Sequence, residues 1–407
     1  MKARRPGRHR TRRRPARPGA RPRARRAAPR GTGREAILII SASEIDADML
    51  YTTRFSVPDP FIFFQAGRRR SVVLSDLEID RGRRAARVDE IISLSDAQRR
   101  MREEEGRGPT TLGELAAYLL SRRGVRRVRV PGSFPIQHLD PLRRRRMQVL
   151  PGGIPFYRER LRKTAREVRH LTGALRIAER GMAAGIECLK GSRPGRDGVL
   201  RIGGERLTSE RLRTVIEQEV LAAGGVPAHT IVAGGVQACD PHEKGHGPLR
   251  ADQAIILDIF PRSAATGYFG DITRTVVRGR AGAELVHQWH VVREGQEVAF
   301  RMLRAGAEGS VVHGAILELF EAEGFKTGFN GKRMEGFFHG TGHGLGLEIH
   351  EPPRVAAMPQ RLEAGNVVTV EPGLYYPRSG GVRLEDVVVI GVRGNRNLTR
   401  FPKFLEI

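Results

Sequence analysis

The chain has few cysteines, few aromatic residues and no long apolar run. Its two cysteines, Cys188 and Cys239, form no closely spaced motif, which is typical of a reducing compartment or simply of two buried thiols. No apolar stretch approaches the about 20 residues that a membrane-spanning helix needs. The N-terminal region also lacks the apolar core of a secretory signal. We therefore expect a soluble, cytoplasmic protein without membrane contact.

Acidic residues are scarce beside basic ones, with 45 Asp and Glu against 71 Lys and Arg and a net charge of +26. Residues 1–34 contain no acid and consist almost entirely of Arg, Pro, Ala and Gly. Such a segment cannot bury a core, so we expect a disordered arm. The arm could contact nucleic acid through phosphates. We favour instead the interpretation that it is upstream sequence translated from a wrongly chosen start codon.

At 407 residues the chain exceeds the usual size of a single core, so two domains are expected. Residues 35–155 combine strand-like runs such as AILIISAS and DPFIFFQAG with the amphipathic helical pattern TTLGELAAYLLSRRG, which predicts an α/β domain. The segment LPGGIPF is the expected linker. In residues 156–407, helical patterns surround acid-bearing strands, which predicts an α+β domain with helices outside a curved antiparallel sheet.

Four carboxylates lie in runs that read as buried strands: Asp258 in AIILDIF, Asp271 in YFGDITRTVV, Glu371 in NVVTVEPG and Glu385 in VRLEDVVVI. Any one of them alone is best interpreted as an edge-strand residue that faces water. Four together favour a metal site, because burying ionised carboxylates is costly unless positive charge compensates them.

The spacing of these acids predicts two hairpins. The first has its centre near Ala264 and Ala265, which places Asp258 opposite Asp271, and the second has its centre near Arg378, which places Glu371 opposite Glu385. Opposed side chains have Cβ atoms roughly 4.5–5.5 Å apart. Two such pairs would form an oxygen-rich cage for two divalent cations about 3.5–4 Å apart.

The segment HGTGHGLGLEIHEPP, residues 339–353, has glycine at every second position in its first half. Glycine disfavours a helix, so we expect this segment to be extended. At about 3.3 Å per residue, His339 and His343 would then lie roughly 13 Å apart, too far to bind one metal together. The pattern predicts one metal ligand here and does not decide which histidine it is.

The motifs GDITRT, HGTGHGLGLEIHE, VEPGLYY and GVRLED, in this order, resemble those of the pita-bread metallopeptidases, specifically the Xaa-Pro aminopeptidase and prolidase branch. The resemblance covers most of residues 240–390. It implies a creatinase-type N-terminal domain followed by a pita-bread catalytic domain, and hence a homo-oligomer. It also implies that two metals are bound, with Asp271 and Glu385 as bridging ligands, by Asp258, Asp271, His343, Glu371 and Glu385.

The same resemblance implies roles for residues beside the metals. His339 would line the substrate pocket, and His350 would hydrogen-bond the substrate or the transition state. His242 would help to stabilise the tetrahedral intermediate, with His246 as a nearby competitor. Arg383 would support the site.

In one respect the sequence departs from this family. Its two aspartates stand thirteen positions apart instead of the usual eleven. An insertion of two residues preserves the side on which strand residues point. We expect it to alter the loop and the rim of the pocket and to leave the chemistry intact.

The ligand set favours Mn²⁺, partly by resemblance, with Co²⁺, Fe²⁺ or Zn²⁺ as alternatives, since no thiolate selects a softer metal. In the mechanism that we expect, a hydroxide that bridges the two metals attacks the peptide carbonyl. Glu371 is the predicted general base, while His350 and His242 donate to the oxyanion.

The leading hypothesis is an aminopeptidase that cleaves the Xaa-Pro bond of peptides with proline at the second position; the proline preference rests on resemblance alone. A close alternative is an Xaa-Pro dipeptidase (prolidase). A third, from another class, is a non-catalytic pita-bread binding module. The presence of all five ligands disfavours this module and equally a metal-free amidinohydrolase of the creatine type.

Overall fold

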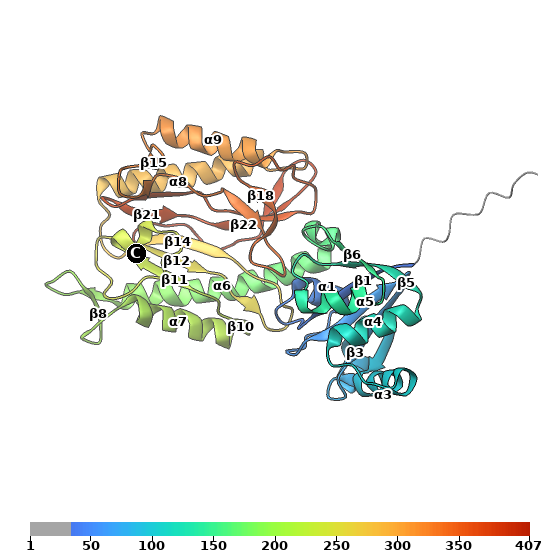
Figure 1. Ribbon diagram of the computed structural model, residues 1–407. Coiled ribbons are helices and arrows are strands. Elements are labelled where there is room, and N and C mark those ends of the chain that lie inside the picture. Colours follow the sequence, from blue (N-terminus) through green and yellow to red (C-terminus); the bar gives the residue numbers. More distant parts are fainter. Residues whose placement is uncertain (1–33) are drawn as a thin grey trace, which may run out of the picture.

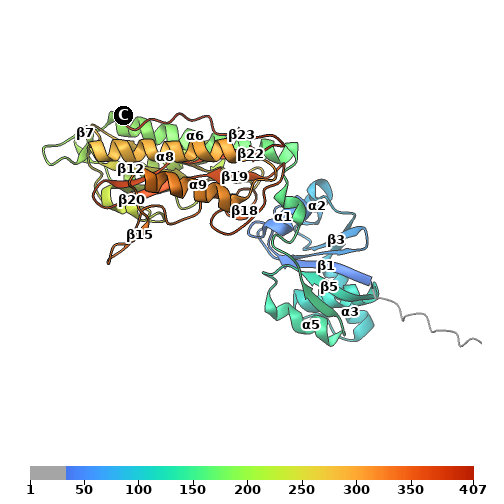
Figure 2. The ribbon, with the colours of Figure 1, turned by 90° about the horizontal axis from the view of Figure 1, so that it is seen from above.

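The computed structural model describes residues 34–407, which form two layered units side by side (Figures 1 and 2). Apart from Arg34, the predicted arm lies outside the described residues. Within residues 34–407, no helix is both long enough and apolar enough to cross a membrane.

The first unit is a mixed six-stranded sheet with helices on both faces, as expected for an α/β domain. Its strand order is β4-β3-β2-β1-β5-β6, with parallel pairing at β3–β4, β1–β5 and β5–β6. The strands are β1 (Arg34–Ser41), β2 (Phe61–Ala66), β3 (Arg69–Leu74), β4 (Glu90–Ser93), β5 (Val125–Val130) and β6 (Gln148–Pro151). The helices are α1 (Ala47–Thr53), α2 (Ile79–Ala85), α3 (Leu94–Glu105), α4 (Leu112–Arg122) and α5 (Leu139–Arg144), with the 3₁₀ turn η1 (Ile136–His138).

The second unit has its strands between two pairs of helices. Figure 1 shows α6 (Ala165–Gly191) and α7 (Ser209–Ala222), in green, below the strands and α8 (Ala283–Met302) and α9 (Gly309–Ala322), in orange, above them. Separate apolar cores lie under each helix pair. At the start of α6, Thr164 and Glu167 form a reciprocal capping box that satisfies the first free N–H groups. This α+β arrangement is the predicted one.

The strands of the second unit form small antiparallel sheets. One sheet holds β11 (Ile231–Gly234), β12 (Ala254–Ile259) and β14 (Ile272–Val277), and another has the order β18-β17-β19-β22-β23. The latter strands are β17 (Gly342–Gly344), β18 (Glu351–Val355), β19 (Val367–Val370), β22 (Asp386–Ile390) and β23 (Asn395–Asn397). Shorter pieces are η2 (Arg158–Leu161), β7 (Arg193–Pro194), β8 (Leu200–Ile202), β9 (Glu205–Arg206), β10 (Gly225–Val226), η3 (Gly235–Cys239), β13 (Arg262–Ser263), β15 (Gly328–Phe329), β16 (Met334–Glu335), β20 (Gly373–Tyr376) and β21 (Gly380–Arg383).

The sheet ends near Pro151 and the next element begins at Arg158. We propose that the two units correspond to the predicted domains 35–155 and 156–407, because residues 152–157, which the structure describes, contain no strand and no α-helix.

The register of the second predicted hairpin is as expected. Strands β19 and β22 pair Val370 with Asp386, and β20 and β21 continue the same register by pairing Gly373 with Arg383. Glu371 and Glu385 therefore lie opposite each other, between two ladders, about a centre at Arg378.

The register of the first hairpin differs from the prediction. Strands β12 and β14 do pair, but Asp258 lies opposite Thr273, and Asp271 precedes β14. The centre is shifted because the loop after Asp258 is not a simple turn: its β13 pairs with β10 instead. Asp271 and Thr273 are two positions apart and so share a face, which keeps both aspartates on one side.

Residues 339–353 contain no helix, as predicted, but they are not one extended segment. Only β17 and the start of β18 are strands, and these two pair antiparallel after a series of bends at residues 346–350. The chain therefore reverses, which brings the ring of His350 to 4.3 Å from that of His343.

Candidate active site

All residues predicted for the site line one cavity of about 810 Å³ between the helix pairs. Most of these residues lie at or next to an end of β12, β14, β17, β19 or β22, and these strand ends border the cavity. The set comprises Asp258, Asp271, His343, Glu371 and Glu385, together with His242, His339, His350 and Arg383. His246 is absent from this lining and its backbone bonds to Gln237 instead, so the geometry favours His242 of the two.

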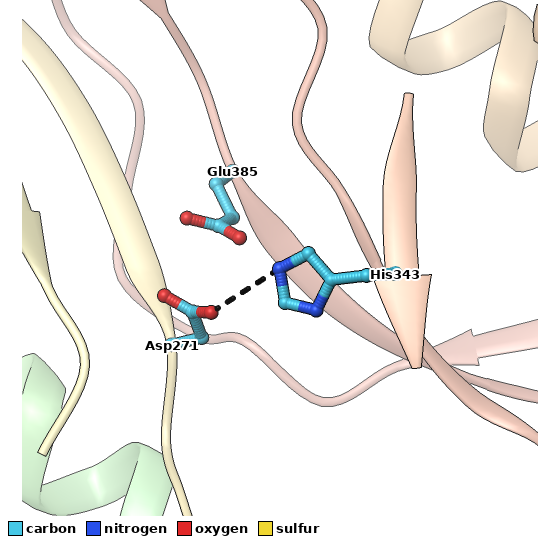
Figure 3. Close-up of side chains that lie close together, drawn as sticks. All are labelled: Asp271, His343 and Glu385. Carbon is cyan, nitrogen blue, oxygen red and sulfur yellow. Dashed lines mark ion pairs between the residues drawn. The ribbon is translucent and has the colours of Figure 1, made fainter. Parts of the chain in front are cut away.

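Three of the predicted ligands converge most closely. One ligand atom each from Asp271, His343 and Glu385 lies within 4.8 Å of the others, and all three residues are buried. Figure 3 shows the three side chains pointing toward one another from separate segments, with His343 Nε2 3.7 Å from Asp271 Oδ2. Glu371 joins this group through its Oε1, which is 3.3 Å from the same imidazole nitrogen.

The tautomer of His343 leaves one nitrogen available. Its Nδ1 lies 3.1 Å from the carbonyl oxygen of Gly344, which can only accept a hydrogen bond, so Nδ1 carries the proton. Burial lowers the pKa of His343 to about 3, so the ring is neutral. Nε2 therefore presents a lone pair to the carboxylates, as a metal-binding histidine does.

Burial and mutual repulsion raise the pKa values of three carboxyl groups of the site. Burial, with the negative charges of Asp258 and Glu371, raises the pKa of Asp271 well above its ordinary value. Burial and the neighbouring acids raise the pKa of Glu385 likewise. Burial also raises the pKa of Glu371 to about 7, although Arg383 opposes this effect. Desolvation and mutual repulsion therefore make ionisation of this cluster unfavourable.

Asp258 has a protein cation as its partner. Arg383 Nη2 donates to Asp258 Oδ2 at 2.6 Å, and both side chains are almost fully shielded from solvent. The remaining oxygen, Oδ1, is buried and has no hydrogen-bond partner among residues 34–407, and neither has Glu385 Oε1. Buried polar atoms of native proteins normally have partners, so these two oxygens indicate a missing ligand.

Two hydroxyl groups orient the acids. Thr273 donates through Oγ1 to Glu385 Oε2 at 2.7 Å, and Thr369 donates to Glu371 Oε1 at 3.2 Å. Both threonines are fully buried. The sequence analysis did not identify them, although their positions two residues from Asp271 and Glu371 place them on the same strand faces as the acids.

Tyr375 is a further residue that the sequence analysis missed. Its hydroxyl lies 2.8 Å from His339 Nε2 and accepts from Arg383 Nη1 at 2.9 Å. His339 Nδ1 faces the carbonyl oxygen of Gly340 at 2.8 Å, so both ring nitrogens are occupied. His339 is thus held in place and is not free to bind a metal, whereas His343 is free to do so.

The remaining polar groups are more open. His350 and His242 are exposed to the cavity, and partial desolvation lowers the pKa of His350. Arg354 also lines the cavity, and its guanidinium has no ion pair within residues 34–407. These three side chains can donate hydrogen bonds to a bound molecule.

Comparison with known proteins agrees with this geometry. Residues 169–391 match the model of metallopeptidase family M24, and this match covers more than half of the chain. The chain belongs to metallopeptidase family M24. An uncharacterized peptidase of Bacillus subtilis is 37% identical to this M24 peptidase over 179 residues, which are 44% of this chain and about half (48%) of that relative. An Xaa-Pro dipeptidase of Pyrococcus horikoshii is 25% identical over 310 residues, 75% of this chain and 82% of the relative.

Solved structures share the whole fold. The X-Pro aminopeptidase of Thermotoga maritima has a TM-score of 0.77 at 20% identity, over 92% of this chain and 98% of its own. The Xaa-Pro dipeptidase of Bacillus anthracis has a TM-score of 0.76 at 23% identity, over 92% and 95%. The predicted fold, a creatinase-type N-terminal domain before a pita-bread catalytic domain, is thereby confirmed for this M24 peptidase.

The residues of this M24 peptidase fit divalent metal ions. Three buried carboxylates and the partly buried Glu371 face one cationic partner within residues 34–407, Arg383; two of their oxygens lack hydrogen-bond partners in the same residues, and a neutral imidazole presents its lone pair. Oxygen donors with one imidazole suit Mn²⁺ and similar ions.

Proposed function

We propose that the protein is a two-metal peptidase that cleaves the Xaa-Pro bond at the N-terminus of peptides. The observation that carries the proposal is the set of four carboxylates and His343 that face one open cavity with too little positive charge. Asp258, Asp271, His343, Glu371 and Glu385 would hold the metals, with Mn²⁺ as our choice and Asp271 and Glu385 as the bridging pair. The names of the relatives from P. horikoshii, B. anthracis and T. maritima supply the preference for proline.

When bound, the two ions would supply Lewis acidity for the peptide carbonyl and would lower the pKa of water so that hydroxide forms near neutral pH. Glu371 is suited to move a proton, because its carboxylate lies 3.3 Å from the ligand nitrogen of His343 and therefore beside the place where the ions and their water would bind. Arg383 fixes Asp258, and Thr273 fixes Glu385, which keeps the acids in one geometry without substrate.

The exposed histidines complete the proposed roles. His350 and His242 lie at the cavity and would donate N–H groups to the oxygen of the scissile carbonyl as it becomes negative. His339 would act as a wall of the substrate pocket, since Tyr375 and Gly340 occupy both its nitrogens.

An Xaa-Pro dipeptidase is the second candidate, and one observation favours it. Arg354 is the only cavity-lining arginine without an ion pair in the described part of the chain. A free guanidinium binds a carboxylate in a two-pronged fashion, and a dipeptide carries its C-terminal carboxylate directly after proline. Arg354 would then limit the length of the substrate.

The deciding experiment is hydrolysis by the full chain loaded with Mn²⁺. Xaa-Pro dipeptides, Xaa-Pro-Yaa tripeptides and peptides that begin with Met would be compared. Release of the first residue from tripeptides supports the aminopeptidase, and cleavage of dipeptides alone supports the dipeptidase. Cleavage of the Met peptides without proline would contradict the proline preference, and no cleavage by metal-loaded protein would support a binding module.

We further propose a homo-oligomer located in the cytoplasm, with the first unit as the contact. Light scattering of the full chain tests the first of these proposals: a mass of one chain, 45.1 kDa, would contradict it.

A further inference from the structure

A second cavity, of about 660 Å³, lies at the junction of the two units. Its lining comes from the chain around α1, the beginning of α6 and the loop 262–268 that joins the two aspartate-bearing strands, together with Arg87 after α2 and Val226 of β10. Figure 1 shows α1 of the first unit beside the end of α6 that faces it, and residues of the two helices share one apolar core. None of the proposed peptidase residues lines this cavity.

The loop of this cavity lies between Asp258 and Asp271, where the family resemblance implies an insertion of two residues. We expected this insertion to alter the rim of the substrate pocket. Of this loop, only Phe260 reaches the active-site cavity, whereas residues 262–268 face the junction. Arg262 bonds there to the carbonyl oxygen of Glu44, and Gly267 packs against Leu50, so the loop is anchored on the first unit.

Positive charge exceeds negative charge in the lining. It contains four arginines, Arg54, Arg87, Arg166 and Arg262, against Glu44 and Glu167. Glu167 does not neutralise the other three arginines, because it accepts hydrogen bonds from Thr164 and Tyr268 and lies 3.7 Å from Arg54. Glu44 is exposed and accepts from Ser56.

Three of these arginines, Arg87, Arg166 and Arg262, have no carboxylate partner within residues 34–407. Arg262 is partly buried, and this burial lowers its pKa. A guanidinium taken from water without a counter-charge is costly, so its environment favours an added anion. His170, beside Arg166, adds no charge, since burial and Arg166 lower its pKa.

We propose that this junction cavity binds a phosphoryl group, either free phosphate or the phosphate of a small monoester, held by Arg87, Arg166 and Arg262. A phosphate dianion matches several guanidinium groups in charge, and its oxygens match their forked N–H donors. The cavity volume exceeds what the anion alone needs and lies within the range of small-molecule sites. An anion held there contacts both units and stabilises their association.

The test is titration calorimetry of the full chain with inorganic phosphate and with glycerol 3-phosphate, at constant ionic strength set by NaCl. Three proteins would be compared: the wild type, Arg87→Gln/Arg166→Gln, and the control Arg193→Gln/Arg196→Gln. The control removes the same charge from exposed arginines around β7, which have no ion pairs in the described chain. Arg87 and Arg166 are exposed, so their replacement leaves folding intact.

We expect saturable binding to the wild type and the control, and a dissociation constant at least about tenfold higher for the Arg87/Arg166 variant, since charged hydrogen bonds are lost. Arg262→Gln should weaken binding similarly. Tighter binding of the monoester assigns the ligand to phosphorylated metabolites, and equal binding assigns it to free phosphate. Equal affinity of the variant and wild type, as binding at the metal centre or the arm would give, overturns the proposal. So does equal weakening in the control, or binding that never saturates.

Discussion

Arg160 Nη2 lies 2.7 Å from Glu351 Oε2, and both side chains are at most 3% exposed. The same guanidinium bonds to Asp48 in α1 at 2.9 Å, and Lys163 bonds to the other oxygen of Glu351. Glu351 directly follows His350 in the chain. One buried cation therefore joins the first unit to the hairpin that carries His343 and His350.

Replacing Arg160 by Met should reduce the free energy of unfolding by about 3–5 kcal/mol, because Glu351 and Asp48 remain buried with less compensation. Chemical denaturation measures this change. Arg162→Met is the matched control: Arg162 is mostly exposed, is 3.9 Å from Glu363, and should contribute less than about 1 kcal/mol. Similar losses in the two variants would contradict a structural role for the buried pair.

Two substitutions in the acid cluster should have opposite effects on metal-free protein. Glu385→Gln removes a charge that its surroundings disfavour and should raise the free energy of unfolding at pH 8 by about 1 kcal/mol or more. Asp258→Asn leaves Arg383 buried without its carboxylate partner and should lower the free energy of unfolding by about 3–5 kcal/mol. Elemental analysis should find less bound metal in both variants. A destabilised metal-free Glu385→Gln would show that its charge is compensated in some other way.

The Glu371 carboxyl should make metal-free protein less stable as the pH rises from about 4.5 to about 7. A carboxyl whose pKa is raised on folding, such as Glu371 at about 7, binds more protons in the folded state, so its stabilising effect is complete at low pH and is lost through the folded pKa. The slope should be at most about 1.4 kcal/mol per pH unit for each such group.

The buried histidines act in the opposite sense at lower pH. The pKa values of His339 and His343 fall to about 3 on folding, so their contribution is complete above about 6.5 and is lost as the pH decreases toward 3. Thermal unfolding of metal-free wild type and Glu371→Gln across pH 4–8 separates these effects. The difference in stability between wild type and variant should change between about pH 4.5 and 7, and a difference that stays constant over this range would exclude Glu371 as a source.

Gly342 in β17 should not tolerate a side chain. A Cβ atom there would lie 2.0 Å from the carbonyl oxygen of Thr369, so Gly342→Ala must separate β17 from β19. We expect a loss of about 1–3 kcal/mol in stability and weaker metal binding, because His343 is the next residue. Gly173→Ala in α6 is the control: nothing lies near its Cβ position, and it should gain about 0.5–1 kcal/mol.

Arg354→Met tests the dipeptidase alternative. If Arg354 binds the C-terminal carboxylate of a dipeptide, the KM for Xaa-Pro should rise about tenfold or more while the KM for an amidated Xaa-Pro-Yaa changes little. Arg361→Met, a nearby arginine outside the cavity lining, should change neither value. Equal increases for both substrates would argue against a length-limiting role.

The sequence predicted those features that depend on local pattern. Alternation and turn residues located the Glu371–Glu385 register correctly, because the hairpin is regular on both sides of Arg378. The Asp258–Asp271 register was wrong, because the intervening loop pairs with β10, a contact between distant segments that local pattern does not encode. For the same reason the reversal at residues 346–350 was missed.

The polar partners of the site were also beyond local pattern. Tyr375, Thr273 and Arg160 have ordinary sequence surroundings, and their importance arises from contacts across many residues. The choice of His343 as the ligand came from family resemblance. Its physical reason, a Gly344 carbonyl that fixes the proton on Nδ1, required the three-dimensional arrangement.

Glu371 and Glu385 lie where the β19–β22 pair ends and the β20–β21 pair begins, so hydrogen-bonded strands flank the two acids on both sides. These backbone hydrogen bonds on both sides should hold the two residues in position when the metal ions are removed. Removal of the ions by a chelator should therefore leave the metal site folded. Metal ions of suitable size should then rebind within the time of mixing, without unfolding of the protein.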